Sequence, residues 1–246
     1  MFAIDKEWVA QNYHGESYFK IPDEATLIDE RAFEGVERLQ RIELPKSVTT
    51  ISECAFKDCK YLESVKAPGV IYLHQGAFYC CKRLKDITLS DNLKLIGDIA
   101  FAECIELPNI IFPSKLKRIG ISAFDKCYNL KNIYIPYSVE YIGEWAFKES
   151  GLTKIIISSQ TKVIQQGTFY ACYGLSEVKL PDNLEVIEML AFYFCKLKDI
   201  YLPGHIKELG QSAFEKCKTL SKIYMPESIE KIGVRAIEPR TQIFFY

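Results

Sequence analysis

The segment LKNIYIPYSVEYIGEWAF, residues 130–147, contains every feature that decides the fold of this chain. In its first part Ile133 and Ile135 would face inward, while Asn132 and Tyr134 would face solvent. This alternation is typical of a strand with one buried side. A proline then ends the strand, because it has no N–H to donate to a sheet. A second, shorter apolar pair follows, and Ala-Phe closes the unit in a short helical or 3₁₀ turn.

The closing dipeptide returns through the whole chain in steps of 22 or 23 residues. A fixed period in this range indicates stacked units, none of which can bury its apolar face alone. The sequence therefore predicts an α/β solenoid of about ten coils, with one extended, in-register sheet of parallel strands and a single row of stacked Phe rings. The copies are Ala32-Phe33, Ala55-Phe56, Ala77-Phe78, Ala100-Phe101, Ala123-Phe124, Ala146-Phe147, Thr168-Phe169, Ala191-Phe192, Ala213-Phe214 and Ala236-Ile237.

The two ends of the chain depart from the repeat. Residues 5–13 have the pattern of a short helix carrying Trp8. We expect residues 1–18 to form an N-terminal cap and residues 19–246 to form one solenoid domain, because solenoids protect their open ends with atypical units.

The last residues, TQIFFY, would add an eleventh strand with Ile243 at the Leu position and Tyr246 at the Ile position. An apolar edge strand can pair with another chain. A homodimer through this C-terminal edge is therefore one expectation.

Composition excludes several classes of partner. Hydrophobic residues make up 48% of the chain and charged residues 26%, which is ordinary for a globular protein. With 31 basic and 32 acidic side chains and no basic stripe, nucleic acid is not an expected partner. No apolar run is long enough for membrane insertion. Asp5 and Glu7 interrupt any leader at the start, so the chain as given predicts a cytoplasmic protein, or a cell-surface or secreted one if a leader was removed.

The full repeat can be written LxxIxLPxxVxxIgxxAFxxC. With Pro after the first strand and AFxxC in the turn, it resembles the BspA-type (treponemal-type) leucine-rich repeat family over roughly residues 19–246. The resemblance implies a right-handed leucine-rich-repeat superhelix. It also implies a non-enzymatic protein, of a kind often found on cell surfaces or secreted and associated with adhesion to proteins or other cells.

Cysteine is the first candidate for chemistry. A disulfide ladder or a soft-metal site is conceivable, but no CxxC pair exists for zinc. Val36 and Ser150 occupy the slot that cysteine fills in other coils, which favours buried, free thiols in a tight apolar position. Cys54 and Cys80 lie outside that slot. The slot holds Cys59, Cys81, Cys104, Cys127, Cys172, Cys195 and Cys217.

Histidine gives no catalytic arrangement. His14, His74 and His205 fall at different positions of their coils, so stacking brings no pair together. A Cys–His dyad would need a base within hydrogen-bond reach and a cleft around both groups. The sequence predicts no catalytic residue, no metal site and no cofactor, and therefore no enzyme.

The outward column of the first strand is the strongest site signal. Its N-terminal half is polar, whereas its C-terminal half is largely apolar or aromatic, as at many interaction sites. Lys179 interrupts the apolar half and could pack over Tyr201. Ordinary strand preference for such residues is an equal alternative. The predicted partner-binding residues are Ile111, Tyr134, Ile156, Lys179, Tyr201 and Tyr224, which follow Glu43, Lys66 and Thr88.

The second strand has an outward column of its own, which is also apolar in the middle. Either another copy of the chain covers this column, or its residues reflect the ordinary preference of strands for apolar side chains. The sequence is compatible with both explanations. It runs through Thr50, Tyr72, Leu95, Arg118, Tyr141, Val163, Val186, Glu208 and Lys231.

Two functions remain open. The leading prediction is a non-catalytic scaffold that binds a partner protein through its first-strand face. The alternative is a secreted or cell-surface adhesin or glycan-binding protein, in which aromatic faces and exposed Asn or Asp side chains would hold sugar rings.

Overall fold

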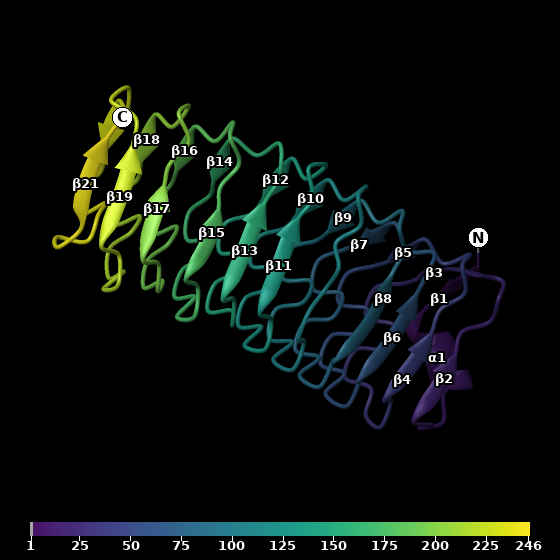
Figure 1. The fold of residues 1–246 in the computed structure, drawn as a ribbon. Helices are drawn as coiled ribbons and strands as arrows, with labels where there is room; N and C mark the ends of the chain where they lie inside the picture. Colours follow the sequence, from purple (N-terminus) through teal and green to yellow (C-terminus); the bar gives the residue numbers. More distant parts are fainter. Residues whose placement is uncertain (1) are drawn as a thin grey trace.

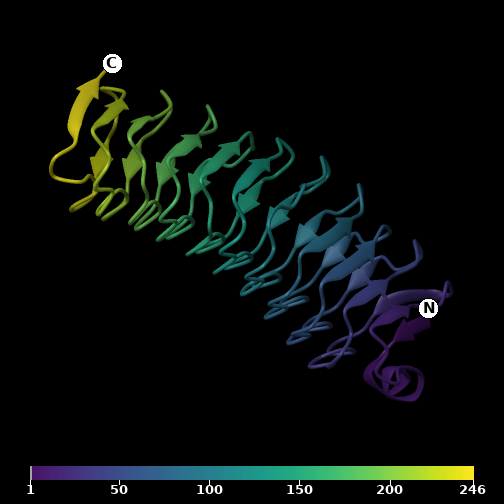
Figure 2. The same cartoon turned by 60° about the horizontal axis from the view of Figure 1, so that its bottom comes forward.

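The computed structural model describes residues 2–246, which form a rod of stacked coils with the two termini at opposite ends (Figures 1 and 2). All strand pairings are parallel and join successive coils. The strands lie in two rows, one for each half of the repeat, and this confirms the predicted solenoid. The first row consists of β2 (Tyr18–Lys20), β4 (Arg41–Glu43), β6 (Ser64–Ala67), β8 (Asp86–Leu89), β11 (Asn132–Ile135), β13 (Lys154–Ile157), β15 (Glu177–Lys179), β17 (Asp199–Tyr201), β19 (Lys222–Met225) and β21 (Gln242–Phe245).

The second row is built mostly of two-residue strands, as the short apolar pair of the repeat predicts. It begins at the N-terminus, where β1 pairs with β3. The row consists of β1 (Phe2–Ile4), β3 (Ala25–Ile28), β5 (Thr50–Ile51), β7 (Tyr72–Leu73), β9 (Leu95–Ile96), β10 (Arg118–Ile119), β12 (Tyr141–Ile142), β14 (Val163–Ile164), β16 (Val186–Ile187), β18 (Glu208–Leu209) and β20 (Lys231–Ile232).

The N-terminal end is covered by the only helix in residues 2–246, α1 (Lys6–Asn12). Asp5 caps it, because its carboxylate accepts a hydrogen bond from the Trp8 backbone N–H at 2.7 Å. The Trp8 ring packs edge-on against Phe19, with ring centroids 6.2 Å apart, and so shields the start of the core. The predicted short helix is present, while the assignment of residues 1–18 as a cap and of residues 19–246 as one solenoid domain stays a prediction.

The Phe row runs through the core as predicted. Successive rings are stacked, with centroids 5.0 to 5.7 Å apart and interplanar angles no larger than 19°. Offset stacking of this kind adds attraction to the burial of the rings. The row consists of Phe33, Phe56, Phe78, Phe101, Phe124, Phe147, Phe169, Phe192 and Phe214, and all nine side chains are fully buried.

The closing Ala-Phe segment is not helical, so helix is a minor part of this fold. It is a series of hydrogen-bonded turns in which residues such as Trp145 and Glu149 have left-handed backbones, with φ of 58° and 53°. Every second N–H group donates to the next coil, as that of Phe124 does to the Ala146 carbonyl at 2.7 Å, and the others donate three residues back within the turn, as that of Ala146 does to the Gly143 carbonyl. The bonds to the next coil interrupt the series of local bonds that the predicted helical turn would have.

The prediction of one unbroken sheet is wrong at three places. The first row divides into β2 to β8, β11 to β15, and β17 to β21, and the second row is interrupted between β12 and β14. The gap between β8 and β11 is visible in Figure 1. Residues 109–112 occupy it without forming a strand.

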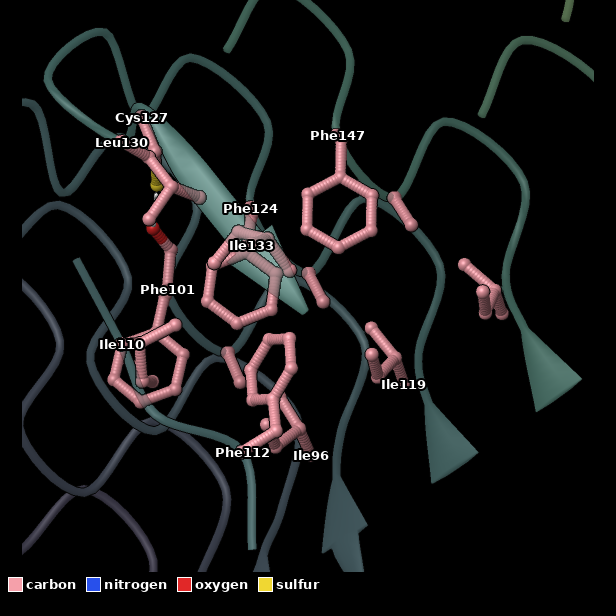
Figure 3. Close-up of a cluster of buried hydrophobic side chains, with 14 of the residues drawn as sticks. Ile96, Phe101, Ile110, Phe112, Ile119, Phe124, Cys127, Leu130, Ile133 and Phe147 are labelled. Carbon is pink, nitrogen blue, oxygen red and sulfur yellow. Dashed lines mark hydrogen bonds between the residues drawn. The ribbon is translucent and has the colours of Figure 1, made fainter. Parts of the chain in front are cut away.

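Pro108 and Phe112 explain this first gap. The N–H of Lys85, one coil earlier, donates to Glu63, and that of Lys131, one coil later, donates to the Pro108 carbonyl. Pro108 itself has no N–H and cannot make the equivalent bond. Phe112 fills a slot that holds leucine or isoleucine in the adjacent coils, and its ring packs on Phe124 at 5.6 Å (Figure 3). A larger core side chain and a missing donor together remove this segment from the ladder.

The eleventh strand has a different register from the predicted one. Ile243 is paired with Ile223, and Phe245 with Met225, so these two residues hold the inward positions. Tyr246 lies beyond the strand, where its hydroxyl donates to the Leu202 carbonyl at 2.5 Å. Phe244 therefore stands in the outward column, which the sequence analysis did not expect.

Candidate interaction surface

The six predicted partner-binding residues all lie on the first-strand side, but in three separate groups. Tyr134, Ile156 and Lys179 occupy adjacent rungs of one sheet. Tyr201 and Tyr224 are adjacent in another sheet, beyond the unpaired boundary between β15 and β17.

Ile111 lies on the strandless coil between β8 and β11. Its side chain is 89% exposed, against 55% for Tyr134 and 65% for Tyr201. Ile156 and Tyr224 are half-buried. Exposed apolar area is thus concentrated on the C-terminal half of this face, as the outward column predicts.

The tyrosines near the C-terminus form a stacked aromatic ladder. The Tyr201 and Tyr224 rings are stacked with centroids 4.1 Å apart, and Tyr224 stacks on Phe244 at 5.0 Å. Aromatic side chains with little conformational freedom make good anchors, because binding costs them little entropy. Phe244 could have been found from its place in the IFFY segment, had the last strand been aligned on Ile223.

The predicted contact of Lys179 with Tyr201 is not formed. Cation–π contacts within residues 2–246 join Arg83 to Tyr61 and Arg118 to Tyr141. Lys179 and Tyr201 stand on strands that do not pair, so their rungs are not held in register. Lys179 instead extends into solvent.

The N-terminal half of the same column is built differently. Lys66 forms an ion pair with Glu43 on the neighbouring strand, at 2.6 Å. Thr88 follows on β8 in the same register. Polar groups that satisfy one another in this way leave little apolar surface for a partner, and the contrast within one column marks the C-terminal half as the distinct part.

The second row presents less aromatic surface. The Arg118 guanidinium covers the Tyr141 ring at 4.1 Å, and Glu208 is ion-paired with Lys231. Val163 and Val186 in the middle of the row are only half-exposed. Of the two columns, the first therefore offers the larger exposed aromatic area.

An aromatic cluster on the turn side was missed by the sequence analysis. Tyr170 and Tyr193 stack at 5.2 Å, and the Trp145 ring meets Tyr170 edge-on at 5.6 Å. Phe194 contacts Tyr193 and Tyr173. Tyr170 and Tyr193 directly follow the repeat Phe, at the position where other coils carry an ion pair such as that of Lys57 with Glu34. Aligning the residues just after the repeat Phe would have revealed the cluster.

A short ladder of alternating charge runs beside the second row. Lys162 and Lys207 both bind the Glu185 carboxylate, at 2.8 and 2.7 Å. The hydrogen bond from Lys162, then that from Lys207 and the charges of both, lower the pKa of Glu185 from 4.5 to about 2. The carboxylate therefore stays ionised in mildly acidic solution.

We expect the ion pairs of Glu185 with Lys162 and Lys207 to remain formed down to about pH 3. Because the pKa of Glu185 is lower in the folded than in the unfolded chain, its stabilising effect is full above pH 4.5 and disappears as the pH falls through about 2. NMR titration of the Glu185 side-chain carbon should give that midpoint. The double variant Lys162→Met with Lys207→Met should raise it toward 4.5, whereas Lys46→Met should not. A wild-type midpoint near 4.5 would contradict the ladder.

The cysteine slot is a row of structural hydrogen bonds. Each thiol donates to the carbonyl of the Phe one coil earlier, as Cys127 does to Phe101 at 3.1 Å (Figure 3). The other pairs of this kind involve Cys59, Cys81, Cys104, Cys172, Cys195 and Cys217, at 3.0 to 3.2 Å. Burial raises the pKa of Cys172 and Cys217 to about 12 and raises that of Cys127 as well. Such thiols are poor nucleophiles.

We expect at most two of the nine thiols to react with Ellman's reagent in the native protein. All nine are free, but only Cys54 has more than marginal exposure, followed by Cys80. Full reaction should require denaturant. A Cys54→Ser, Cys80→Ser variant should be silent in the native state, and rapid reaction of seven or more thiols in wild type would contradict the buried ladder.

No catalytic cluster is assembled from the residues the sequence singled out. His14, His74 and His205 lie on different coils. Burial raises the pKa of Cys81, Cys104 and Cys195, which makes these thiols poor nucleophiles. Residues 2–246 contain no group of three or more His, Cys, Asp or Glu side chains placed to hold a metal ion. Within the same range, no helix is long and apolar enough to span a bilayer.

The stacked parallel rungs and the AFxxC turn define a repeat solenoid of the leucine-rich class. The chain belongs to the BspA-type leucine-rich repeat family, since the family described as "BspA type Leucine rich repeat region (6 copies)" matches residues 11–101, 62–173 and 146–243. Proteins with this repeat and fold are generally non-enzymatic scaffolds. A comparison with curated protein sequences found no match.

Several solved bacterial structures are similar to this chain. A leucine-rich repeat protein from Bacteroides ovatus is 24% identical with a TM-score of 0.68, over 93% of this chain and 83% of the other. A leucine rich cell surface protein from Faecalibacterium prausnitzii is 25% identical, also with a TM-score of 0.68, over 95% and 70%. The T. pallidum leucine rich repeat protein is 27% identical with a TM-score of 0.62, over 79% and 82%.

Proposed function

We propose that this protein is a non-catalytic scaffold that captures a partner protein on the C-terminal half of its first-strand face. The observation that supports this most is the exposure of Tyr134 and Tyr201 on a surface whose N-terminal half is neutralised by ion pairs. Binding energy at protein interfaces is concentrated in a few aromatic residues. Stacking holds Tyr201 and Tyr224 in place, so their ordering adds little to the cost of binding.

The test removes three tyrosines from this face and compares capture. Tyr134→Ala, Tyr201→Ala and Tyr224→Ala, combined, should abolish enrichment of the partner that wild type retains from an extract of the native source. The matched control replaces Tyr61, Tyr128 and Tyr173, three exposed tyrosines outside the strand row. It should capture normally, and both variants should melt cooperatively. Normal capture by the strand-face variant would remove this face from the proposal.

A cell-surface location is the second part of the proposal, with adhesion as the alternative function. It is supported by the similarity to the surface protein of F. prausnitzii. Immunolabelling of intact and permeabilised native cells distinguishes the two locations, because a surface protein is labelled in both. Labelling only after permeabilisation would favour the cytoplasmic alternative.

Self-association through β21 is a further candidate. β21 pairs on one side only, with β19, and its inward residues Ile243 and Phe245 are exposed. The opposite end is covered by α1, so two copies would meet through their β21 edges. Light scattering should report a dimer that Phe245→Lys and deletion of residues 243–246 each convert to a monomer. A wild-type monomer at high concentration would refute it.

A further inference from the structure

A notch opens in the surface where one corner of the solenoid differs from the rest. In most coils a Pro follows the first strand, as Pro136 and Pro181 do, but the coil between them has Ser158 and Ser159. The Ser159 side chain turns inward, is almost fully buried, and forms a short hydrogen bond with the Thr161 hydroxyl. The residues in the same position on the adjacent coils, Tyr137 and Asp182, point outward.

This inward turn leaves space between the two neighbouring corners. The notch has a volume of about 520 Å³, which is within the range of roughly 300 to 1,000 Å³ typical of small-molecule sites. Tyr137, which is 67% exposed, forms one wall with Tyr134, and Asp182 and Asn183 form the other. Gln160 and Lys179 complete the rim.

The polar groups around the notch are not used by the protein itself. Within residues 2–246, the side chains of Gln160, Lys179 and Asp182 have no hydrogen-bond or ion-pair partner, although ion pairs are frequent elsewhere on this surface. Asn183 donates its amide N–H to the Gln160 carbonyl at 3.3 Å, which leaves its side-chain oxygen to accept. Two tyrosine rings therefore face a set of available donors and acceptors.

Two backbone donors at the corner are already used by the solenoid. The Ser158 N–H donates to the Ile135 carbonyl at 3.0 Å, and the Gln160 N–H donates to the Val139 carbonyl at 3.0 Å. The side chains around the notch therefore supply most of the polar groups for recognition. Planar rings beside amide and carboxylate oxygens suit a ligand that has an apolar C–H face and many hydroxyls.

We propose that this notch binds a neutral pyranose, such as the terminal sugar of a glycan. The ring would stack on Tyr137, and vicinal hydroxyls would donate to Asp182 and accept from Gln160. The lining contains one cationic residue, Lys179, and one anionic residue, Asp182. Because these charges balance, the site has no net charge that would select an anionic or a cationic sugar over a neutral one. This site does not depend on protein capture, but it shares Tyr134, Ile156 and Lys179 with the proposed partner face.

Saturation-transfer NMR on the full chain tests the proposal. The probes are the methyl glycosides of mannose, galactose and N-acetylglucosamine. At least one should receive saturation on one face of its ring, and Tyr137→Ala and Asp182→Ala should each weaken binding about tenfold or more, equivalent to about 1.4 kcal/mol. Tyr128→Ala, which removes an exposed tyrosine outside the notch, should bind as wild type does.

Three outcomes would overturn the proposal. They are no saturation of any probe, equal binding by wild type and both notch variants, and loss of partner-protein capture on Tyr137→Ala without any sugar binding. The last would assign the notch to a protein partner. The saturation-transfer experiment uses no protein partner, so a negative result would not contradict the scaffold proposal. Likewise, a negative result in the capture experiment would not contradict the sugar site.

Discussion

Replacement of Phe124 by alanine is expected to lower the free energy of unfolding by about 3 to 5 kcal/mol. The Phe124 side chain is fully buried and stacks on Phe101 and Phe147, at 5.3 Å in both cases, and it also contacts Phe112. Alanine would leave a cavity that rigid coils on both sides cannot close. Urea denaturation followed by circular dichroism measures the loss.

The matched control for this variant is Tyr134→Ala, which removes a ring of similar size from the surface of the neighbouring coil. We expect that change to cost less than about 1 kcal/mol, as surface substitutions away from special features usually do. Equal losses in the two variants would mean that the Phe row is not the main stabilising element.

The second large effect is expected at Gly143, where the backbones of two successive coils lie in close contact. A Cβ added there would lie 2.5 Å from the Gly120 carbonyl carbon and from the Ile121 nitrogen. Both are backbone atoms of the preceding coil and cannot move without displacing it. Gly143→Ala should therefore lower the free energy of unfolding by about 1 to 3 kcal/mol, the range typical of overpacking.

Gly204→Ala is the control for this substitution, because a Cβ at Gly204 meets no atom within 4 Å. Thermal melts should show a clear loss for Gly143→Ala and almost none for Gly204→Ala. An unchanged melting temperature for Gly143→Ala would contradict the close spacing of the coils at this column.

Features repeated in every coil could be predicted from the sequence, and features carried by a single coil could not. The Phe row, the cysteine slot and the outward face of Tyr134 follow from positions that recur every 22 or 23 residues. Averaging over ten coils makes each of these assignments independent of any local irregularity.

The breaks in the sheets depend on single residues within that average. Pro108 removes one donor and Phe112 enlarges one core position, and together they separate β8 from β11. The notch likewise depends on a single residue, Ser159, whose side chain turns inward and is hydrogen-bonded to Thr161. A consensus over ten coils includes such residues only as variants at one position. It therefore does not predict the break in the sheet or the notch that they produce.

The alignment of the last strand failed for a related reason. The final turn has its own length, and the last four residues, IFFY, are all apolar or aromatic. A hydrophobic pattern without alternation fits several registers equally well. Only the pairing of Ile243 with Ile223 places Phe244 in the aromatic ladder with Tyr224.

Hydrogen–deuterium exchange of the protein alone and bound to the partner that it captures tests the central claim most directly. Binding on the first-strand face should slow exchange in β11, β13, β17 and β19, and leave β12, β16 and β18 of the second row unchanged. Protection confined to the second row, or to the turns around Tyr170 and Tyr193, would contradict the claim.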